Sequence, residues 1–340
     1  MLGIKRAIST SEKLLYFIIS LLYAFWLAGL PSEIFRDRNN YEVYATDYDI
    51  LLDLYTSTYT IPFREPIFLF LNKWLSVFND PIITIQVFVF FTCFSLSFFI
   101  LKTSRNFLIA VLFFLFMFFN AQTFAIQLVT IRQGIGLGVL LWYLLYVKEY
   151  NYLKLIKFTA ILGFIHTSFF IVSFLLFVDW FVLYKTKYKS FNFRLFFLAA
   201  VSIFINLLLF TVTKLIGAKQ NYADFEFSSG GGAFILWFTV FVYILVFKPK
   251  TYELAKEKYI YALTITGLVI YLTSYFLTPI AGRIIGTYMP FVFYILLYRP
   301  KLRDIVFVLM VIFVFIVLFV NGGAEGFMTV NLGTLLREML

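Results

Sequence analysis

The chain has 340 residues, of which 62% are hydrophobic and 14% are charged, and its formal net charge at pH 7 is +10. Soluble globular domains carry about 25% charged residues. The composition therefore excludes an ordinary soluble domain and predicts an integral membrane protein with many spans. The single histidine and single cysteine exclude a His/Cys metal cluster and an intrachain disulfide.

Eleven apolar runs predict transmembrane helices, so we expect an all-α polytopic membrane protein with one membrane domain over residues 1–340. A further run, 65–78, is short and contains Lys73, and we interpret it as a re-entrant or interfacial segment. Residues 153–183 are expected to form a tight helical hairpin turning at 166–168, with one long tilted helix as the alternative. The eleven runs are residues 14–30, 81–101, 106–120, 131–147, 153–166, 168–183, 195–213, 233–247, 259–278, 284–298 and 304–320.

Lysine and arginine fall in short clusters between the apolar runs, which is the pattern of a polytopic membrane protein. Nucleic-acid binding is therefore not expected, despite the positive charge. Placing the N-terminus inside puts most basic residues on the cytoplasmic side and makes residues 31–64 and 214–232 external loops. A full span at 66–79 is the alternative, and it would move Lys102 and Arg105 outside.

The first external loop, 31–64, contains six carboxylates and five tyrosines. Such a loop suits sugars, because aromatic rings stack on pyranose faces while carboxylates accept hydrogen bonds from hydroxyls. A solvated loop without a binding role is the alternative. Asp47 and Asp49 also form an Asp-x-Asp pattern, which can hold a divalent cation. Because two aspartates at this spacing are common by chance, we do not expect a metal site.

Glu65 precedes Pro66 at the start of the short segment 65–78. Proline is favoured at the first position of a helix, and a carboxylate there interacts favourably with the helix dipole. A structural role at a helix start is therefore one interpretation of Glu65. A catalytic or sugar-binding carboxylate is the other.

Arg132 and Arg283 lie at predicted outer helix ends, with no Asp or Glu within ten positions in sequence. A charge at the membrane boundary is costly unless a partner compensates it, and a guanidinium group suits phosphate or carboxylate. We therefore expect anion binding, with snorkelling of Arg132 to the interface as the alternative. Gly134 and Gly138 form a GxxxG pair, which predicts close approach of a neighbouring helix.

His166 stands with two hydroxyl residues, Thr167 and Ser168, at a predicted outer turn. Imidazole is the side chain best suited to exchange a proton near neutral pH. His166 is therefore a candidate proton acceptor for a sugar hydroxyl. A hydrogen-bonded structural histidine is the alternative.

Five short motifs follow one another in the order "YATDYD", "REPIFLFLNKWL", "IRQGIGLGV", "GFIHTSFFIV" and "GRIIGTY". This order resembles the EpsG-like branch of Wzy-type polysaccharide polymerases. The resemblance implies a GT-C-like fold and a glycosyltransferase of the bacterial cytoplasmic (inner) membrane. Such an enzyme joins undecaprenyl-diphosphate-linked oligosaccharide repeat units at the outer face. The implied assignments are catalytic roles for His166, Asp47 and Glu65, diphosphate binding for Arg132 and Arg283, and substrate binding for Asp49, Gln133 and Tyr288.

The implied reaction is attack of a hydroxyl of one lipid-linked unit on the anomeric carbon of another. The leaving group is a lipid diphosphate, so cations such as Arg132 and Arg283 would stabilise it. His166, Asp47 or Glu65 would take the proton. Neither a metal nor a cofactor is expected. The expected partners are undecaprenyl-diphosphate-linked glycans and membrane lipid, with a flippase and a chain-length regulator as further candidates.

Three other classes stay open. A GT-C glycosyltransferase could use a lipid-monophosphate sugar, with Asp47 and Asp49 holding a metal. A transporter or flippase should show repeated halves with broken helices, and the sequence has no convincing internal repeat. A membrane O-acyltransferase could use His166 as a base, but it would not obviously need two outer arginines.

Overall fold

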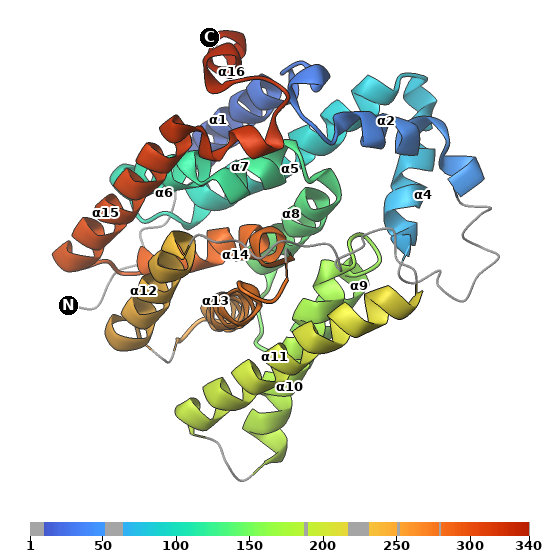
Figure 1. Ribbon diagram of the computed structural model, residues 1–340. Coiled ribbons are helices and arrows are strands. Elements are labelled where there is room, and N and C mark those ends of the chain that lie inside the picture. The colour runs from blue at the N-terminus through green and yellow to red at the C-terminus, as the bar shows by residue number, and fades with distance from the viewer. Residues whose placement is uncertain are drawn as a thin grey trace. The chain divides into compact units, whose positions relative to one another are not determined.

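The computed structural model describes residues 10–51, 64–186, 190–216, 231–249, 252–278 and 280–339. In the described residues the regular structure is helical. The β-type pairing there is one isolated antiparallel bridge, between Phe35 and Met328. Figure 1 shows the helices. They are α1 (Thr10–Ala28), α2 (Arg38–Thr46), α4 (Pro66–Leu75), α5 (Pro81–Thr103), α6 (Phe107–Phe119), α7 (Ala121–Leu128), α8 (Ile131–Tyr146), α9 (Tyr152–Leu162), α10 (Ser168–Lys185), α11 (Phe191–Ile216), α12 (Gly232–Phe247), α13 (Ala255–Ser274), α14 (Ile280–Leu296), α15 (Leu302–Leu318) and α16 (Leu332–Met339).

The helices confirm a multi-pass membrane protein. In the described part of the chain, four helices are long and apolar enough to cross a membrane, and a bent pair makes a fifth candidate. All eleven predicted runs fall on helices, but several of these helices are shorter than a full span. Eleven spans, the GT-C-like arrangement and the single membrane domain stay predictions. The candidate spans are Pro81–Thr103, Ser168–Lys185, Phe191–Leu208 and Leu302–Gly323, with Phe107–Phe119 and Ala121–Leu128 as the bent pair.

The chain forms two compact units. Unit 1 comprises residues 1–49, 71–142 and 312–340, and unit 2 comprises residues 50–70 and 143–311. Helices α4, α8 and α15 each continue from one unit into the other.

Unit 1 is built around α5, which packs along α1 and contacts α2, α6 and α7. The Asp80 side chain caps the start of α5 by accepting from the Ile82 N–H at 2.8 Å, with Pro81 at the first helical position. Helix α8 lies close to α5 at Gly134 and Gly138. A Cβ on Gly138 would come within 2.8 Å of the Phe91 ring, and one on Gly134 within 2.9 Å of Thr92. The predicted packing role of this glycine pair is confirmed.

Two parts of unit 1 differ from the sequence-based prediction. Residues 38–46 of the predicted external loop form helix α2, because Arg38, Tyr41 and Ala45 repeat at helical spacing and are buried on one face. The chain also continues as α7 after α6, at an angle of 81°. Asn120 makes this bend, since its carboxamide accepts from the Thr123 N–H at 2.9 Å and starts a new helix.

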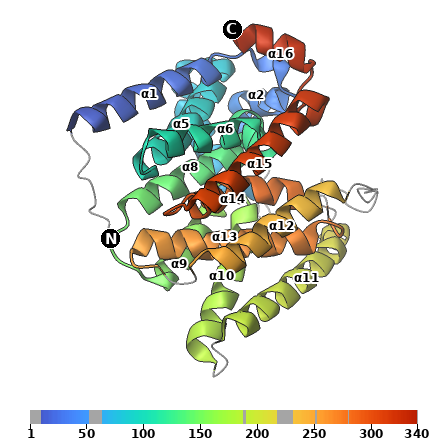
Figure 2. The same ribbon diagram turned by 90° about the vertical axis from the view of Figure 1, so that its left-hand side faces the viewer.

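Unit 2 contains the predicted hairpin. Helix α9 ends at Leu162, α10 begins at Ser168, and the two helices pack against each other, which confirms the hairpin over one long helix. Helix α13 packs on α11, α12 and α14, as both ribbon views show (Figures 1 and 2).

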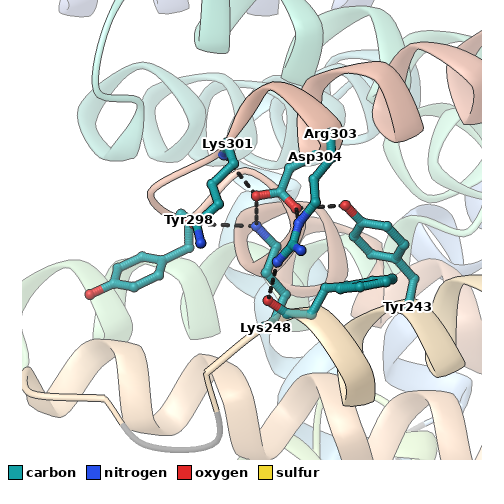
Figure 3. Close-up of polar contacts among 7 residues, drawn as sticks. Tyr243, Lys248, Tyr298, Lys301, Arg303 and Asp304 are labelled. Atoms are coloured by element: carbon teal, nitrogen blue, oxygen red, sulfur yellow. Dashed lines mark hydrogen bonds and ion pairs between the residues drawn. The ribbon is translucent and has the colours of Figure 1, made fainter.

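A buried ion pair ties the end of α12 to the start of α15 within unit 2 (Figure 3). The Lys248 ammonium lies 3.0 Å from the Asp304 carboxylate, and their side chains are 2% and 4% exposed. The Tyr243 hydroxyl and the Lys301 N–H also donate to this carboxylate, at 2.6 and 2.8 Å. The further donors to Asp304 offset part of the cost of removing this charged pair from water.

The other predicted segments have mixed outcomes. Residues 65–78 contain helix α4, which begins at Pro66 as the sequence predicts; its re-entrant placement stays a prediction. Residues 52–63 and 217–230, which make up much of the two predicted external loops, lie outside the described residues.

Candidate functional site

Glu65 and His166 meet in unit 2, although 101 positions separate them in sequence. The Nδ1 atom of His166 lies 2.5 Å from Oε1 of Glu65. The Thr167 N–H donates to the same oxygen at 3.2 Å, and the Ile67 N–H donates to the Phe164 carbonyl at 3.0 Å. These bonds fix the residue before α4 against the turn between α9 and α10.

The backbone of Glu65 adopts a left-handed conformation, with φ of 56°. This conformation costs roughly 1–2 kcal/mol for a residue with a side chain. The following residue is Pro66, which further restricts the backbone of its predecessor. The surrounding hydrogen bonds therefore hold Glu65 in a strained conformation that directs its carboxylate to His166, as is typical of functional sites.

The contact defines the chemistry open to His166. An ionised carboxylate only accepts hydrogen bonds, so when Glu65 is ionised, Nδ1 of the ring carries the proton that Glu65 accepts. In the neutral ring this leaves the lone pair of Nε2 to take a proton from another group. The Glu65 side chain is 7% exposed and that of His166 is 19% exposed. The pair is shielded from bulk water, yet part of the ring stays accessible.

Arg132 lies in the first turn of α8 in unit 1, against two tyrosines of α2. The centre of its guanidinium is 5.8 Å from the Tyr41 ring centroid and 5.2 Å from that of Tyr44. A ring face attracts a cation through its quadrupole. The two rings therefore help to hold the guanidinium in place.

Arg38 is a second arginine of this region, and the sequence analysis did not single it out. Its side chain is fully buried, its Nε–H donates to the Leu128 carbonyl at 2.9 Å, and it lies 4.8 Å from the Phe35 ring centroid. Among the described residues, its two terminal nitrogens have no hydrogen-bond partner. Burial lowers the pKa of Arg38 to about 10, so it stays cationic at neutral pH. The sequence signal for this burial is the spacing of Arg38, Tyr41 and Ala45, which places the three residues on one face of a helix.

The two aspartates of the Asp-x-Asp pattern are exposed at the end of α2. The Asp47 N–H donates to the Val43 carbonyl at 2.9 Å and ends the helix. Asp49 pairs with Lys73 at 3.2 Å. Within the described residues, no group of three or more His, Cys, Asp or Glu side chains is placed to hold a metal ion.

Gln133 and Tyr288 are both buried, at 1% exposure. Tyr288 packs its ring directly on Gly267 of α13, where any Cβ would come within 2.1 Å of the ring. Arg283 lies in the first turn of α14, and its side chain is outside what the structure describes. The predicted site residues thus divide into Asp47, Asp49, Arg132 and Gln133 in unit 1, and Glu65, His166, Arg283 and Tyr288 in unit 2.

Comparison with known proteins gives one result. The model of the EpsG family matches residues 13–327, which is nearly the whole chain. This match indicates a membrane polysaccharide polymerase or a related enzyme. No curated protein and no solved structure matches the chain.

Replacing Glu65 with alanine should destabilise the protein by about 1–3 kcal/mol, because the His166 ring and the Thr167 N–H lose their acceptor. Glutamine should cost less, since its amide oxygen still accepts from Thr167. The melting temperature of the purified protein in detergent measures both changes. Glu253→Ala is the control, because that side chain is 81% exposed. Equal melting temperatures for Glu65→Ala and the control would show that the contact does not stabilise the fold.

Proposed function

Because the chain belongs to the EpsG family, we propose that it polymerises undecaprenyl-diphosphate-linked oligosaccharide repeat units at the outer face of the cytoplasmic membrane. The observation that carries this proposal is the contact between Glu65 and His166. A carboxylate on a strained backbone that contacts the single histidine of the chain suits proton transfer from a sugar hydroxyl.

The proposed reaction transfers a glycan between two lipid carriers. A hydroxyl oxygen of the acceptor unit attacks the anomeric carbon of the donor glycan, and a new glycosidic bond forms. The bond from that carbon to the diphosphate oxygen breaks, and the electron pair leaves with the lipid diphosphate. The hydroxyl proton passes to Nε2 of His166, and Glu65 stabilises the imidazolium that results. Asp47, which is exposed, is the alternative acceptor.

The second requirement is stabilisation of the leaving diphosphate, and we assign it to Arg132 together with Arg283. Fixed cations aimed at a developing anion lower the barrier strongly, because they need no rearrangement during the reaction. The rings of Tyr41 and Tyr44 hold Arg132 in place. We assign a positioning role to Arg38, which ties α2 to the Leu128 carbonyl.

The remaining assignments complete the proposal. Asp49, Gln133 and Tyr288 are proposed substrate contacts, although the last two are buried. A GT-C-like arrangement of eleven spans, a flippase that supplies the substrate and a regulator of chain length also belong to it. The lipid-monophosphate alternative would need Asp47 and Asp49 to hold a metal, and the pairing of Asp49 with Lys73 argues against that role.

His166→Gln and Glu65→Gln should each slow polymerisation by about 10²–10⁴-fold, because both interrupt general base catalysis. In cells the loss should appear as glycans of single repeat units in place of long chains, which gel electrophoresis resolves. Membrane abundance of each variant is the control. Long chains from a well-expressed His166→Gln protein would rule out histidine as the base and favour Asp47.

Arg132→Lys should fail almost as severely as Arg132→Ala, at about 10²–10³-fold in rate. Lysine keeps the charge but loses the planar fork that binds two phosphate oxygens at once. The rate of chain growth on lipid-linked substrate in membranes is the measurement. Arg337→Lys, an exposed arginine of the same unit, is the matched control and should be unaffected. If Arg132→Ala makes long chains at normal rate, Arg132 is only an interface residue.

Polymerisation should continue at full rate in excess EDTA, because arginines can neutralise the diphosphate without a metal. The assay compares chain growth in washed membranes with and without the chelator, followed by addition of Mg²⁺ or Mn²⁺. Activity that is lost in EDTA and restored by either ion would instead support the lipid-monophosphate glycosyltransferase.

A further inference from the structure

A cavity of 310 Å³ lies in unit 2, where the starts of α9, α11 and α13 meet the end of α10. It lies far from the Glu65–His166 pair. His166 precedes the first residue of α10, whereas Asp179 and Leu183, near the other end of that helix, line the cavity. Leu183 follows the first residue of α10 by 15 positions, which is about 22 Å along the helix axis, against the roughly 30 Å of a bilayer core. We therefore expect the pair and the cavity to lie toward opposite membrane surfaces.

Charge also distinguishes this end of unit 2. Three lysines lie next to the ends of the helices that line the cavity: Lys148 and Lys154 near the start of α9, and Lys185 at the end of α10. A membrane protein carries such an excess of lysine on its cytoplasmic loops. The cavity is thus expected at the level of the cytoplasmic lipid head groups.

One ion pair inside the cavity is already complete. The Arg194 guanidinium donates to both carboxylate oxygens of Asp179, at 2.6 to 3.0 Å. The Tyr152 hydroxyl adds a third donor group to the same carboxylate at 2.7 Å. Because these charges cancel, Asp179 and Arg194 shape the cavity without giving it a net charge.

Lys258 adds a positive charge to the cavity beyond the Asp179–Arg194 pair. Its ammonium group lines the cavity and lies 5.2 Å from the Tyr150 ring centroid. In the part of the chain that the structure describes, no carboxylate forms an ion pair with it. The cavity therefore presents one positive charge beside an aromatic face.

Two tyrosines that line the cavity have hydroxyls without an acceptor among the described residues. The hydroxyls of Tyr252 and Tyr261 are buried, and neither has a hydrogen-bond partner among the described residues. Their rings lie 5.1 Å apart. Buried polar groups are nearly always hydrogen-bonded. Burial raises the pKa of Tyr252, so its hydroxyl stays protonated.

We propose that this cavity binds the phosphate head group of an anionic phospholipid from the cytoplasmic leaflet. One cation and two hydroxyl donors match the single charge and free oxygens of a phosphodiester. Basic pockets between transmembrane helices on the cytoplasmic side bind such head groups. Helix α11, which lines the cavity, also exposes an apolar surface for acyl chains, with Phe196 71% and Phe204 60% exposed. This site goes beyond the proposed polymerase activity and needs no turnover to be tested.

The test compares the full-length protein in nanodiscs of phosphatidylcholine with discs that also contain phosphatidylglycerol. Phosphatidylglycerol should raise the melting temperature of the wild type by about 2–4 °C. Lys258→Gln should abolish this rise. Lys256→Gln is the matched control, since Lys256 lies on the same helix, 5.8 Å from the Tyr294 ring centroid, and outside the cavity. It should keep the full rise.

Deleting the hydroxyls separates binding from folding. Tyr252→Phe and Tyr261→Phe should melt like the wild type in phosphatidylcholine but lose the rise in phosphatidylglycerol. Tyr259→Phe should behave in the opposite way, because its hydroxyl donates to the Asn151 carbonyl at 2.8 Å. That variant should melt lower in both lipids and keep the rise.

Native mass spectrometry of the same samples should show retained phosphatidylglycerol on the wild type and less on Lys258→Gln or Tyr252→Phe. The proposal would be overturned if phosphatidylglycerol raised the melting temperature of these two variants as much as that of the wild type. If the lysine variant does not accumulate, the result for the tyrosine variant is decisive. Inorganic phosphate added to phosphatidylcholine discs should have no effect. An equal rise with inorganic phosphate would assign the cavity to a free anion and overturn the lipid as its ligand.

Discussion

The hydrogen bond between Glu65 and His166 joins two distant segments of unit 2. It holds the turn between α9 and α10 against the residue that precedes α4, and it keeps Glu65 in a left-handed backbone conformation. A backbone strained in this way persists only because the contacts around it are strong enough to compensate. The same bond fixes which ring nitrogen is left to exchange protons. Folding and the proposed chemistry of unit 2 therefore depend on one interaction.

Unit 1 handles positive charge in a different way. Arg132 lies against tyrosine rings, and Arg38 is buried against a backbone carbonyl and a phenylalanine ring. Rings and carbonyls are attractive to a cation but do not neutralise it as a carboxylate does. In the polymerase proposal, Arg132 binds the anionic ligand that arrives with the substrate, and Arg38 positions α2.

The lysine-rich end of unit 2 combines completed and incomplete polar groups. Asp304 with Lys248, and Asp179 with Arg194, are ion pairs whose donors and acceptors are matched within the protein. Each ties two helices of unit 2 together. The hydroxyls of Tyr252 and Tyr261 and the ammonium of Lys258 are not matched in this way among the described residues. The proposed lipid site assigns the second kind of group to a ligand.

The sequence by itself determined the membrane class, the positions of the apolar helices, the hairpin at His166 and the close packing at Gly134 and Gly138. These features follow from composition and from patterns of only a few residues, which local physics governs. Helix α2 and the bend at Asn120 escaped prediction, because polar side chains there are buried or cap a helix only once neighbouring helices are in place. The pairing of Glu65 with His166, the burial of Arg38 and the cavity near Lys258 were decided by tertiary structure alone. They join groups far apart in sequence, and no local pattern records which distant segment a side chain will meet.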